Sequence, residues 1–478
     1  MKVISLYETA KDTDRRIESV QPATRKATVG RLLSCSIELN CAQTFQKVKG
    51  FGCALTESAG YVLSFLDEEQ QKKLVESCFG KSENSNRYVF ARTHMNSCDF
   101  SLENWSCVPK KDETLESFSF ERTDRYMTPL LKAATESSEK LTVMVTPWSP
   151  PEWMKTNNDM NHGGKLKAEY YDLWAKYFVK YLSGLKERGI NVGYVSIQNE
   201  PEAVQIWDSC IWTVEEEGKF AVNCLRPALD KAGFENVKIL TWDHNRDNLV
   251  IRFEKNMSLP GAEKAIAGAA YHWYSGDQYD HVEEVSKKWP DKDLFFTEGS
   301  IEGGSRPGMW YCGERYGHNV INDLNSGCTA WIDWNMLLNI EGGPNHVNNN
   351  CDAAILVDTE KKEVVYQNSY YYLGHFSRFI EPGSSRLGCD VNGFMTPATV
   401  DGRMGNTMEA CAFRRPDNRI ALVVMNRTEA DMLFELKLCD DIKDKTEEKV
   451  YTSCVDGSNE DISFVCPPRS IQTYIIEA

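Results

Sequence analysis

The sequence predicts an α/β protein, a (β/α)8 TIM barrel with an appended antiparallel β-sandwich domain. Apolar, strand-like stretches alternate with long helical patterns between residues 48 and 380, which is the rhythm of such a barrel. Several stretches are almost continuously apolar, as is typical of strands buried on both faces of a parallel sheet. Both ends of the chain carry short alternating stretches between turn residues, which indicate antiparallel strands instead.

Eight stretches are expected to form the barrel strands. They cover residues 48–58, 88–100, 141–151, 192–201, 237–245, 265–275, 294–300 and 327–335. Helical patterns follow at residues 67–80, 168–190, 214–233 and 369–380. In the first of these helices, Asp67 is a suitable N-terminal cap and Gly80 a suitable end.

The barrel is predicted to span residues 41–382. Residues 383–478 are predicted to form the β-sandwich, to which residues 1–40 contribute one or two strands. The alternating stretches that indicate the sandwich are TVGRLLSCSIELN near the start, and MEACAFRR, NRIALVVMNR, MLFELKL and SIQTYIIEA towards the end.

The composition is that of an ordinary globular protein, with a formal net charge of −16. This charge disfavours nucleic acid as a partner, because phosphate binding needs a basic face. No run of about 18 apolar residues occurs, so no membrane span is expected. The first residues, MKVISLYETAKDTDRR, lack the apolar core of a secretory signal, and the 16 cysteines are scattered. We therefore expect a cytoplasmic protein with reduced thiols, whose oligomeric state the sequence leaves open.

Acids and aromatic residues gather where the expected strands end, which is where a barrel of this kind builds its active site. They are Glu57, Asp99, Trp148, Asn199, Glu200, Trp242, Asp243, His272, Trp273, Tyr274, Glu298, Trp331, Asp333, Trp334 and Asn335. Core packing does not require this repeated pattern. Indole rings stack on the C–H faces of sugars, and carboxylates and amides bind hydroxyl pairs, so the pattern indicates sugar binding.

Two glutamates stand out among these residues. Glu200 ends the fourth expected strand and Glu298 the seventh, and these strands face each other across a barrel mouth. Hydrolysis of a glycoside with retention needs two carboxyls roughly 5 Å apart, one as nucleophile and one as general acid and base. The ionised nucleophile would raise the pKa of its partner by like-charge repulsion. Asn199 fits a hydrogen bond to the sugar 2-hydroxyl, and Pro201 would end the strand.

Structural alternatives exist for each residue. Glu298 or Asp99 could cap a following helix. Tyr274 could be a packing aromatic and Trp148 a loop anchor, and His272 could support a neighbouring side chain. Their joint placement at strand ends favours the functional interpretation.

Other chemistries lack their motifs. GFG at residues 50–52 is not followed by the third glycine of a dinucleotide loop, and the chain has no phosphate-binding P-loop. The eight histidines are isolated, without the pairs typical of metal-dependent hydrolases, and no G-x-S-x-G elbow occurs. We therefore expect no metal and no cofactor.

Longer motifs carry a family resemblance. They are GFGCALTESAG (50–60), NSCDFS (96–101), TPWSPPEWMKTN (146–157), IQNEP (197–201), HWY (272–274), FTEGS (296–300), DWNMLLNIEGGPNHVNNN (333–350) and YLGHFSRFI (372–380). In combination they resemble glycoside hydrolase family 30, in the branch that contains the glucocerebrosidases. IQNEP alone would indicate only the wider clan of retaining barrel glycosidases.

The resemblance implies roles for individual residues. Glu200 would be the acid/base and Glu298 the nucleophile. The positions that match the family's glycone-binding residues are Asp99, Trp148, Asn199, Trp334 and Asn349, and Tyr274 matches a tyrosine near the nucleophile. His272 lies in the same motif as Tyr274 and is included among the substrate-binding candidates.

The resemblance also has departures. Lysosomal ceramide-cleaving members carry a tryptophan where this chain has His346, and segments 202–218 and 301–316 differ from theirs. These loops shape the leaving-group side, so ceramide is not assigned as the leaving group. A reduced, acidic protein without a leader suggests a bacterial cytoplasmic enzyme for small imported glycosides.

The expected function is that of a retaining exo-β-glycosidase, a β-glucosidase in the first place, acting on small-molecule or oligosaccharide β-glycosides. Asp99 and Trp148 match positions that recognise a terminal glucose. β-Xylosidase, β-fucosidase or β-1,6-glucanase activity on the same scaffold is the alternative. An inactive carbohydrate-binding protein is a further alternative, against which the presence of both glutamates speaks.

Overall fold

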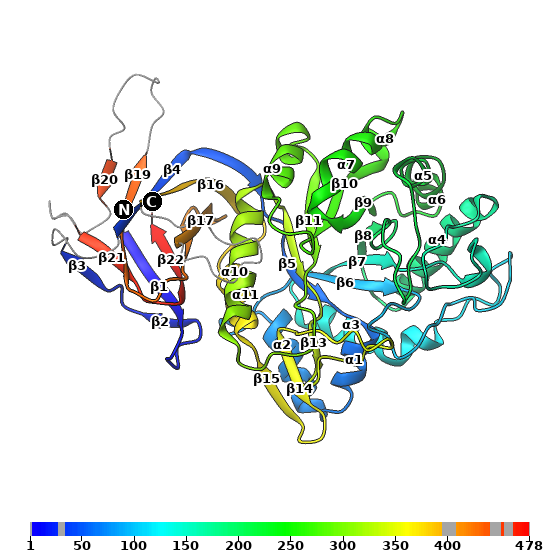
Figure 1. Ribbon diagram of the computed structural model, residues 1–478, viewed down its shortest axis with the longest axis horizontal. Helices are drawn as coiled ribbons and strands as arrows, with labels where there is room; N and C mark the ends of the chain where they lie inside the picture. The colour runs from blue at the N-terminus through cyan, green and yellow to red at the C-terminus, as the bar shows by residue number, and fades with distance from the viewer. Residues whose placement is uncertain (1, 27–33, 394–407, 440–450, 454–461, 478) are drawn as a thin grey trace. The chain divides into compact units, whose positions relative to one another are not determined.

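The computed structural model describes residues 2–26, 34–393, 408–439, 451–453 and 462–477 (Figure 1). The chain divides into two compact units. The barrel unit consists of Phe51–Pro307 and Ala330–Tyr366, and the sandwich unit of Met1–Gly50, Gly308–Thr329 and Gln367–Ala478. Among the described helices, none has the length and apolar character needed to cross a lipid bilayer. No disulfide bond is found among the cysteines whose side chains the structure describes.

The barrel unit confirms the predicted fold. Eight strands form a closed barrel in chain order, from β5 to β12 and back to β5. They are β5 Gly50–Ala54, β6 Phe90–Met95, β7 Thr142–Pro147, β8 Val192–Ser196, β9 Lys238–Asn245, β10 Ile266–His272, β11 Asp293–Glu298 and β12 Ala330–Asp333. Large apolar side chains from these strands fill the barrel interior; the buried cluster comprises Phe90, Met144, Tyr194, Leu240, Ala270, Phe295, Ala330 and Ile332.

Helices connect the strands, and those that the sequence predicts are present. In the barrel unit they are α1 Glu57–Leu63, α2 Glu68–Phe79, α3 Glu121–Ser137, α4 Tyr171–Glu187, α5 Val214–Phe220, α6 Arg226–Lys231, α7 Leu249–Met257, α8 Ala262–Ala265 and α9 Tyr279–Lys288, with short turns η1 Glu152–Met154, η2 Ala168–Tyr170, η3 Ala221–Leu225 and η4 Arg246–Asn248. Asp67 and Gln70 form a reciprocal capping box that starts α2, which stabilises this helix end by satisfying two free N–H groups. A small sheet of β13 Leu337–Asn339, β14 Ile355–Asp358 and β15 Glu363–Tyr366, which the sequence did not predict, follows β12.

Several barrel strands end earlier than the sequence predicts, and this changes how two residues are placed. β8 ends at Ser196, so Pro201 does not end the strand. The main chain instead turns after the strand, where the Ala203 N–H donates to the Glu200 carbonyl at 2.9 Å. Glu57 was expected at a strand end but begins α1, because the Thr56 side chain caps that helix by accepting from Ala59 N.

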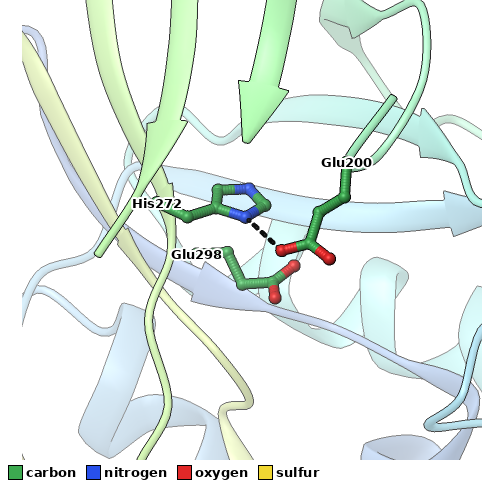
Figure 2. A group of neighbouring side chains, drawn as sticks. All are labelled: Glu200, His272 and Glu298. Carbon is green, nitrogen blue, oxygen red and sulfur yellow. Dashed lines mark hydrogen bonds and ion pairs between the residues drawn. The ribbon is translucent and has the colours of Figure 1, made fainter. Parts of the chain in front are cut away.

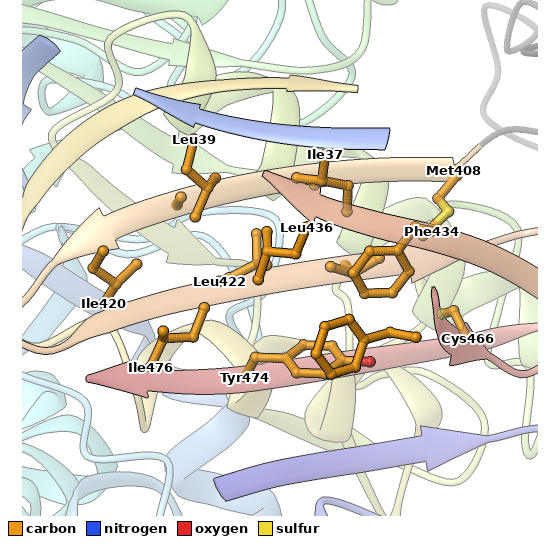
Figure 3. Packing of buried hydrophobic residues seen from close by; sticks show 14 of the residues in the cluster. Ile37, Leu39, Met408, Ile420, Leu422, Phe434, Leu436, Cys466, Tyr474 and Ile476 are labelled. Carbon is orange, nitrogen blue, oxygen red and sulfur yellow. The ribbon is translucent and has the colours of Figure 1, made fainter. Parts of the chain in front are cut away.

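The sandwich unit contains eleven described strands, mostly antiparallel, of which ten follow one hydrogen-bonded path and β20 pairs with β19 beside it. They are β1 Lys2–Ala10, β2 Glu18–Val20, β3 Thr24–Lys26, β4 Ser34–Lys47, β16 Ser385–Gly393, β17 Met408–Arg414, β18 Ile420–Asn426, β19 Met432–Cys439, β20 Tyr451–Ser453, β21 Ile462–Cys466 and β22 Ser470–Glu477. One pair, β4 with β19, is parallel. Alternate side chains point inward to form a core around Ile37, Leu422, Phe434 and Tyr474 (Figure 3), as the period-2 pattern requires.

The N-terminal segment contributes more to the sandwich than the sequence indicates. Four strands, β1 to β4, come from it rather than one or two. The first of them, β1, pairs with the last strand β22 over nearly its whole length. Residues 28–33 of the predicted stretch TVGRLLSCSIELN lie outside the described residues.

Two helices near the predicted domain boundary group with the sandwich strands. They are α10 (Trp310–Asn325) and α11 (Asn368–Ser377). His375 in α11 is hydrogen-bonded to Thr473 and Thr9 at 2.8 and 2.9 Å, and Asn325 in α10 donates to the Ala410 carbonyl at 2.9 Å. These buried polar bonds explain why the compact unit includes residues that the sequence assigned to the barrel.

Candidate active site

A buried arginine organises the floor of the site. Arg92 lies on β6 and is fully buried. Its guanidinium donates to Glu298 Oε2 at 2.7 Å, to Asn199 Oδ1 at 2.8 Å and to Asp243 Oδ2 at 3.0 Å. One cation therefore orients three side chains from three different strand ends, and the planar fork of arginine suits such multiple contacts.

Asp243 is a second centre of this network. Its carboxylate accepts from Thr297 Oγ1 at 2.6 Å and Thr146 Oγ1 at 3.3 Å, besides Arg92. Burial by itself would raise the pKa of Asp243, but the charges and hydrogen bonds of Arg92 and His272 hold the pKa well below its usual range. Asp243 is therefore a permanent anion beneath the site.

The backbone at this edge of the barrel is strained. Trp242, Asp243 and Glu200 have φ values of 74°, 52° and 47°, in the left-handed region that side chains with a Cβ rarely occupy. The Glu200 N–H donates to the Asp243 carbonyl at 2.9 Å, which ties the two turns together. Such strain clusters at functional sites, where the surrounding structure maintains it.

The two glutamates that the sequence singles out face each other, with His272 beside them (Figure 2). Ligand atoms of Glu200, His272 and Glu298 all lie within 4.8 Å of one another. His272 Nδ1 lies 3.2 Å from Glu200 Oε1, and His272 Nε2 lies 3.1 Å from Asp243 Oδ1. An oxygen of Glu200 and an oxygen of Glu298 within 4.8 Å of each other suit the close carboxyl pair of a retaining glycosidase, with carboxyls about 5–5.5 Å apart, better than the wider pair of an inverting one, at about 6.5–9.5 Å.

The protonation of this group differs from the sequence-based expectation. Burial opposes a charge on His272, but Glu298, Asp243 and Glu200 together raise its pKa to about 9. Burial raises the pKa of Glu298, while His272 and Arg92 oppose this rise only in part. Burial would also raise the pKa of Glu200, yet the hydrogen bond from His272 and the two nearby histidines lower it. In the free protein, His272 and Glu200 thus share a proton that resides on the imidazole.

Glu298 has two donors. Besides Arg92, the Tyr274 hydroxyl donates to Glu298 Oε1 at 3.1 Å. Glu200 has a hydrogen bond from a side chain only at Oε1 among the described residues. The two carboxylates therefore differ, since one is bound at both oxygens and the other keeps one oxygen available.

Aromatic rings and amides form the opposite wall. Trp148 and Trp334 stack with centroids 5.1 Å apart, and the Arg92 guanidinium lies over both rings. Asp99 Oδ2 accepts from Asn345 Nδ2 at 3.0 Å, and the Asp99 carbonyl accepts from the His346 N–H at 3.0 Å. These bonds hold the segment before Asn349 against Asp99.

Residues from both walls line one pocket of about 250 Å³. Of the residues predicted from the sequence, it includes Asp99, Trp148, Asn199, Glu200, Tyr274, Glu298, Trp334 and Asn349. His272 was also predicted to bind substrate, but it is fully buried, is not among the residues that line the pocket, and contacts Glu200.

Some strand-end residues do not join the pocket. The Glu57 carboxylate instead accepts from Trp105 Nε1 and Arg122 Nη2, each at 2.9 Å. Trp242, Trp273 and Trp331 are buried in the core.

Sequence reasoning did not identify Arg92, Gln205, Trp207, His244 or Glu302. Arg92 had a usable signal, because an arginine within the apolar stretch YVFARTHM is unusual for a buried strand. Gln205, Trp207 and Glu302 lie on loops, where no periodicity indicates which side chains face a pocket. His244 lies near the end of β9, and the sequence contained no signal that set it apart from the other isolated histidines.

The cluster of Glu200, His272 and Glu298 also has the ligand types of a metal site. However, the Arg92 guanidinium is already bonded to Glu298, so a divalent cation there would face a fixed positive charge at close range. The geometry fits a carboxylate pair neutralised by protein side chains.

Comparison with known proteins agrees with this geometry. Residues 48–380 match the model of the glycosyl hydrolase family 30 TIM-barrel domain, and residues 383–474 match that of the family's beta sandwich domain. The chain is 34% identical to the lysosomal acid glucosylceramidase of Mus musculus over 415 residues, which are 83% of this chain and 78% of the mouse protein. It is 31% identical to putative glucosylceramidase 4 of Caenorhabditis elegans, covering 90% and 83% of the two chains.

Solved structures show the same relationship. The structure of SrfJ from Salmonella typhimurium superposes with a TM-score of 0.86 at 33% identity, covering 99% of both chains. The endo-beta1,6-glucanase BT3312 shares the fold with a TM-score of 0.80 at 24% identity, again over 99% of both chains. The family matches together cover most of the chain, so this protein belongs to glycosyl hydrolase family 30 and is a glycoside hydrolase.

Proposed function

We propose that this protein is a retaining exo-β-glycosidase with a preference for terminal β-D-glucosides. The observation that carries the proposal is the pair of facing carboxylates, Glu200 and Glu298, with oxygens within 4.8 Å at the wall of one pocket. This spacing suits double displacement through a covalent glycosyl-enzyme.

In this mechanism Glu298 is the nucleophile. Arg92 and Tyr274 hold its two oxygens and so aim the carboxylate, and Arg92 opposes the rise in pKa that burial causes. As Glu298 attacks the anomeric carbon, the bond to the leaving oxygen breaks and a glycosyl ester forms.

Glu200 is the acid and base. The proton that it shares with His272 moves from the imidazole to the carboxylate and then to the leaving oxygen, so that no alkoxide is released. In the second step Glu200 removes a proton from water, and the water oxygen attacks the anomeric carbon and releases Glu298. Asn199, fixed by Arg92, is placed to bind the sugar 2-hydroxyl, a contact that strengthens in the transition state.

The pocket supports exo action. Its volume of about 250 Å³ is below the usual range of about 300–1,000 Å³ for ligand pockets, which suits a short substrate rather than the interior of a long polymer. We assign to Asp99, and to the segment that bonds to it through Asn345 and His346, the role of blocking a longer non-reducing chain. Endo action on a β-1,6-glucan, the activity named for one related protein of Neurospora crassa at 26% identity, is the competing proposal.

Two measurements test the proposal. Labelling with a 2-fluoro β-glucoside followed by peptide mapping should place the sugar on Glu298. A panel of aryl β-D-glycosides should show glucoside turnover above xyloside and fucoside turnover, and hydrolysis of a β-1,6-glucan should release glucose rather than longer products. Sugar binding by calorimetry without turnover of any aryl glycoside would instead identify an inactive carbohydrate-binding protein. The cytoplasmic location stays a prediction from the sequence.

A further inference from the structure

The residues that line the pocket divide into two sets. In the inner set, the polar ends of Asp99, Asn199, Tyr274 and Glu298 are hydrogen-bonded to other protein groups. In the outer set, the side chains of Gln205, Trp207, His244 and Glu302 line the same pocket. Within the described part of the chain, none of these four side chains makes a hydrogen bond at 3.5 Å or less.

The outer set lies beside the acid/base. His244 Nε2 lies 4.0 Å from Glu200 Oε1. Gln205 and Trp207 follow Glu200 on the loop after β8, and Glu302 follows Glu298 on the loop after β11. Glu200 delivers its proton to the leaving oxygen, so groups around Glu200 surround the leaving group rather than the sugar that is transferred.

The chemistry of the outer set matches a sugar. Trp207 packs on one side against the cluster that contains Trp148 and Trp334 and remains half-buried, so part of its indole is available as a stacking surface. An amide, an imidazole nitrogen and a carboxylate stand near it, and these groups bind hydroxyls as donors and acceptors. An alkyl leaving group would displace water from these polar groups without replacing its hydrogen bonds.

We infer that Gln205, Trp207, His244 and Glu302 form a subsite for a sugar leaving group, so that the substrates are β-linked glucosyl disaccharides or short oligosaccharides rather than glucosides of long-chain lipids. The inference rests on the proposed function, because it assumes cleavage next to Glu200. The same subsite would bind a sugar acceptor in place of water and so permit transfer of the glucosyl group to that sugar.

The test compares three classes of substrate with the full-length protein. They are an aryl β-D-glucoside, octyl β-D-glucoside and the four glucosyl-β-glucose disaccharides with 1,2, 1,3, 1,4 and 1,6 linkages. At least one disaccharide should have a higher kcat/KM than octyl glucoside. The measured quantity is the ratio of kcat/KM for the best disaccharide to kcat/KM for octyl glucoside. In Trp207→Ala, this ratio should fall about tenfold, since one stacking contact is lost. Turnover of the aryl glucoside should change much less.

Two further variants keep the test decisive. Gln205→Ala removes a polar group and leaves the packed Trp207 ring in place, so it can replace Trp207→Ala if that variant does not fold. It should lower the same ratio. Ile206→Ala is the matched control, because Ile206 is on the same loop, is 60% exposed and does not line the pocket; its ratio should equal that of the wild type.

The outcomes separate the two proposals. If octyl glucoside exceeds every disaccharide, or if Trp207→Ala and Gln205→Ala leave the ratio at the wild-type value, the sugar subsite is wrong and the glucosidase proposal stands. If the wild type turns over none of the substrates, including the aryl glucoside, the proposed function itself is wrong.

Discussion

Each unit of this protein contains a buried cluster of charged side chains, and the two clusters differ in how completely their groups are paired. In the sandwich unit, Glu409 accepts from His318 at 2.9 Å and from Asn322 at 3.2 Å, and it also pairs with Arg427. In the barrel unit, Arg92, Asp243 and His272 are equally buried. Glu200, however, keeps one carboxylate oxygen without a side-chain donor among the described residues and lines a pocket.

The difference shows that buried charge is not sufficient evidence for a catalytic site. Glu409 on β17 is bonded at both oxygens, to His318 and Asn322 of α10 and to Arg427, which follows β18. A chemically useful cluster needs a cavity and a group whose bonding is incomplete until the substrate arrives.

Replacement of Glu298 by glycine should remove measurable turnover of aryl glucosides, because no nucleophile remains. Azide should restore turnover and give a glycosyl azide of inverted configuration, since it attacks from the face that Glu298 occupied. The measurement is product configuration by NMR. A rescued product of retained configuration would show that Glu298 is not the nucleophile.

Replacement of Glu200 by alanine should have an effect that depends on the leaving group. For poor leaving groups the loss in kcat should be on the order of 10²–10⁴-fold, the usual contribution of general acid catalysis. Highly activated aryl groups need little protonation and should lose far less in the glycosylation step. Equal losses across a series of leaving groups would contradict the acid/base assignment.

The two clusters can be compared directly through their arginines. Arg92→Met and Arg427→Met should each destabilise the protein by roughly 3–5 kcal/mol, because each removes the arginine that neutralises a buried carboxylate. Denaturant unfolding measures this loss. Only Arg92→Met should also lower kcat per folded molecule, since Arg92 holds Glu298 and Asn199. Loss of kcat in folded Arg427→Met would remove the distinction between the clusters.

The pH dependence of stability should show whether His272 is positively charged in the folded protein. Its pKa is raised from 6.5 to about 9 by the surrounding carboxylates, despite burial. A histidine with a raised pKa in the folded state contributes stability fully below its unfolded pKa of about 6.5 and loses it as pH rises through about 9. The wild-type melting temperature should therefore fall over this range more than that of His272→Gln. Parallel pH profiles for the two proteins would contradict a charged His272.

Much of the fold could be predicted from the sequence, because the period of the apolar residues reflects which side of each element is buried. Near-continuous apolar strands such as β7 and β11 need cover on both faces, and this requirement leads directly to a barrel. Helix α2 was predictable down to its cap at Asp67, because a capping box involves neighbours in sequence. The number of strands that residues 2–47 contribute was not predictable, since β1 finds its partner β22 more than 450 residues away, as their register shows.

The candidate site was predictable in part for the same reason. Glu200 and Glu298 were marked by strand ends and motifs, which are local signals. The pKa order of the two acids was not predictable from like-charge repulsion alone, because the bond between Glu200 and His272 reverses the expected shift.

The sequence by itself determined the fold class, the eight strands and the residue types that reach the barrel mouth, because these follow from hydrophobic period and local turn chemistry. Only the tertiary structure decided which of them meet. It placed Arg92 in contact with Glu298, Asn199 and Asp243, His272 between Glu200 and Asp243, and Gln205 and Trp207 in the same pocket as Glu200. Hydrogen bonds and charges act over a few ångströms in space, and the distance between residues along the chain does not record that separation.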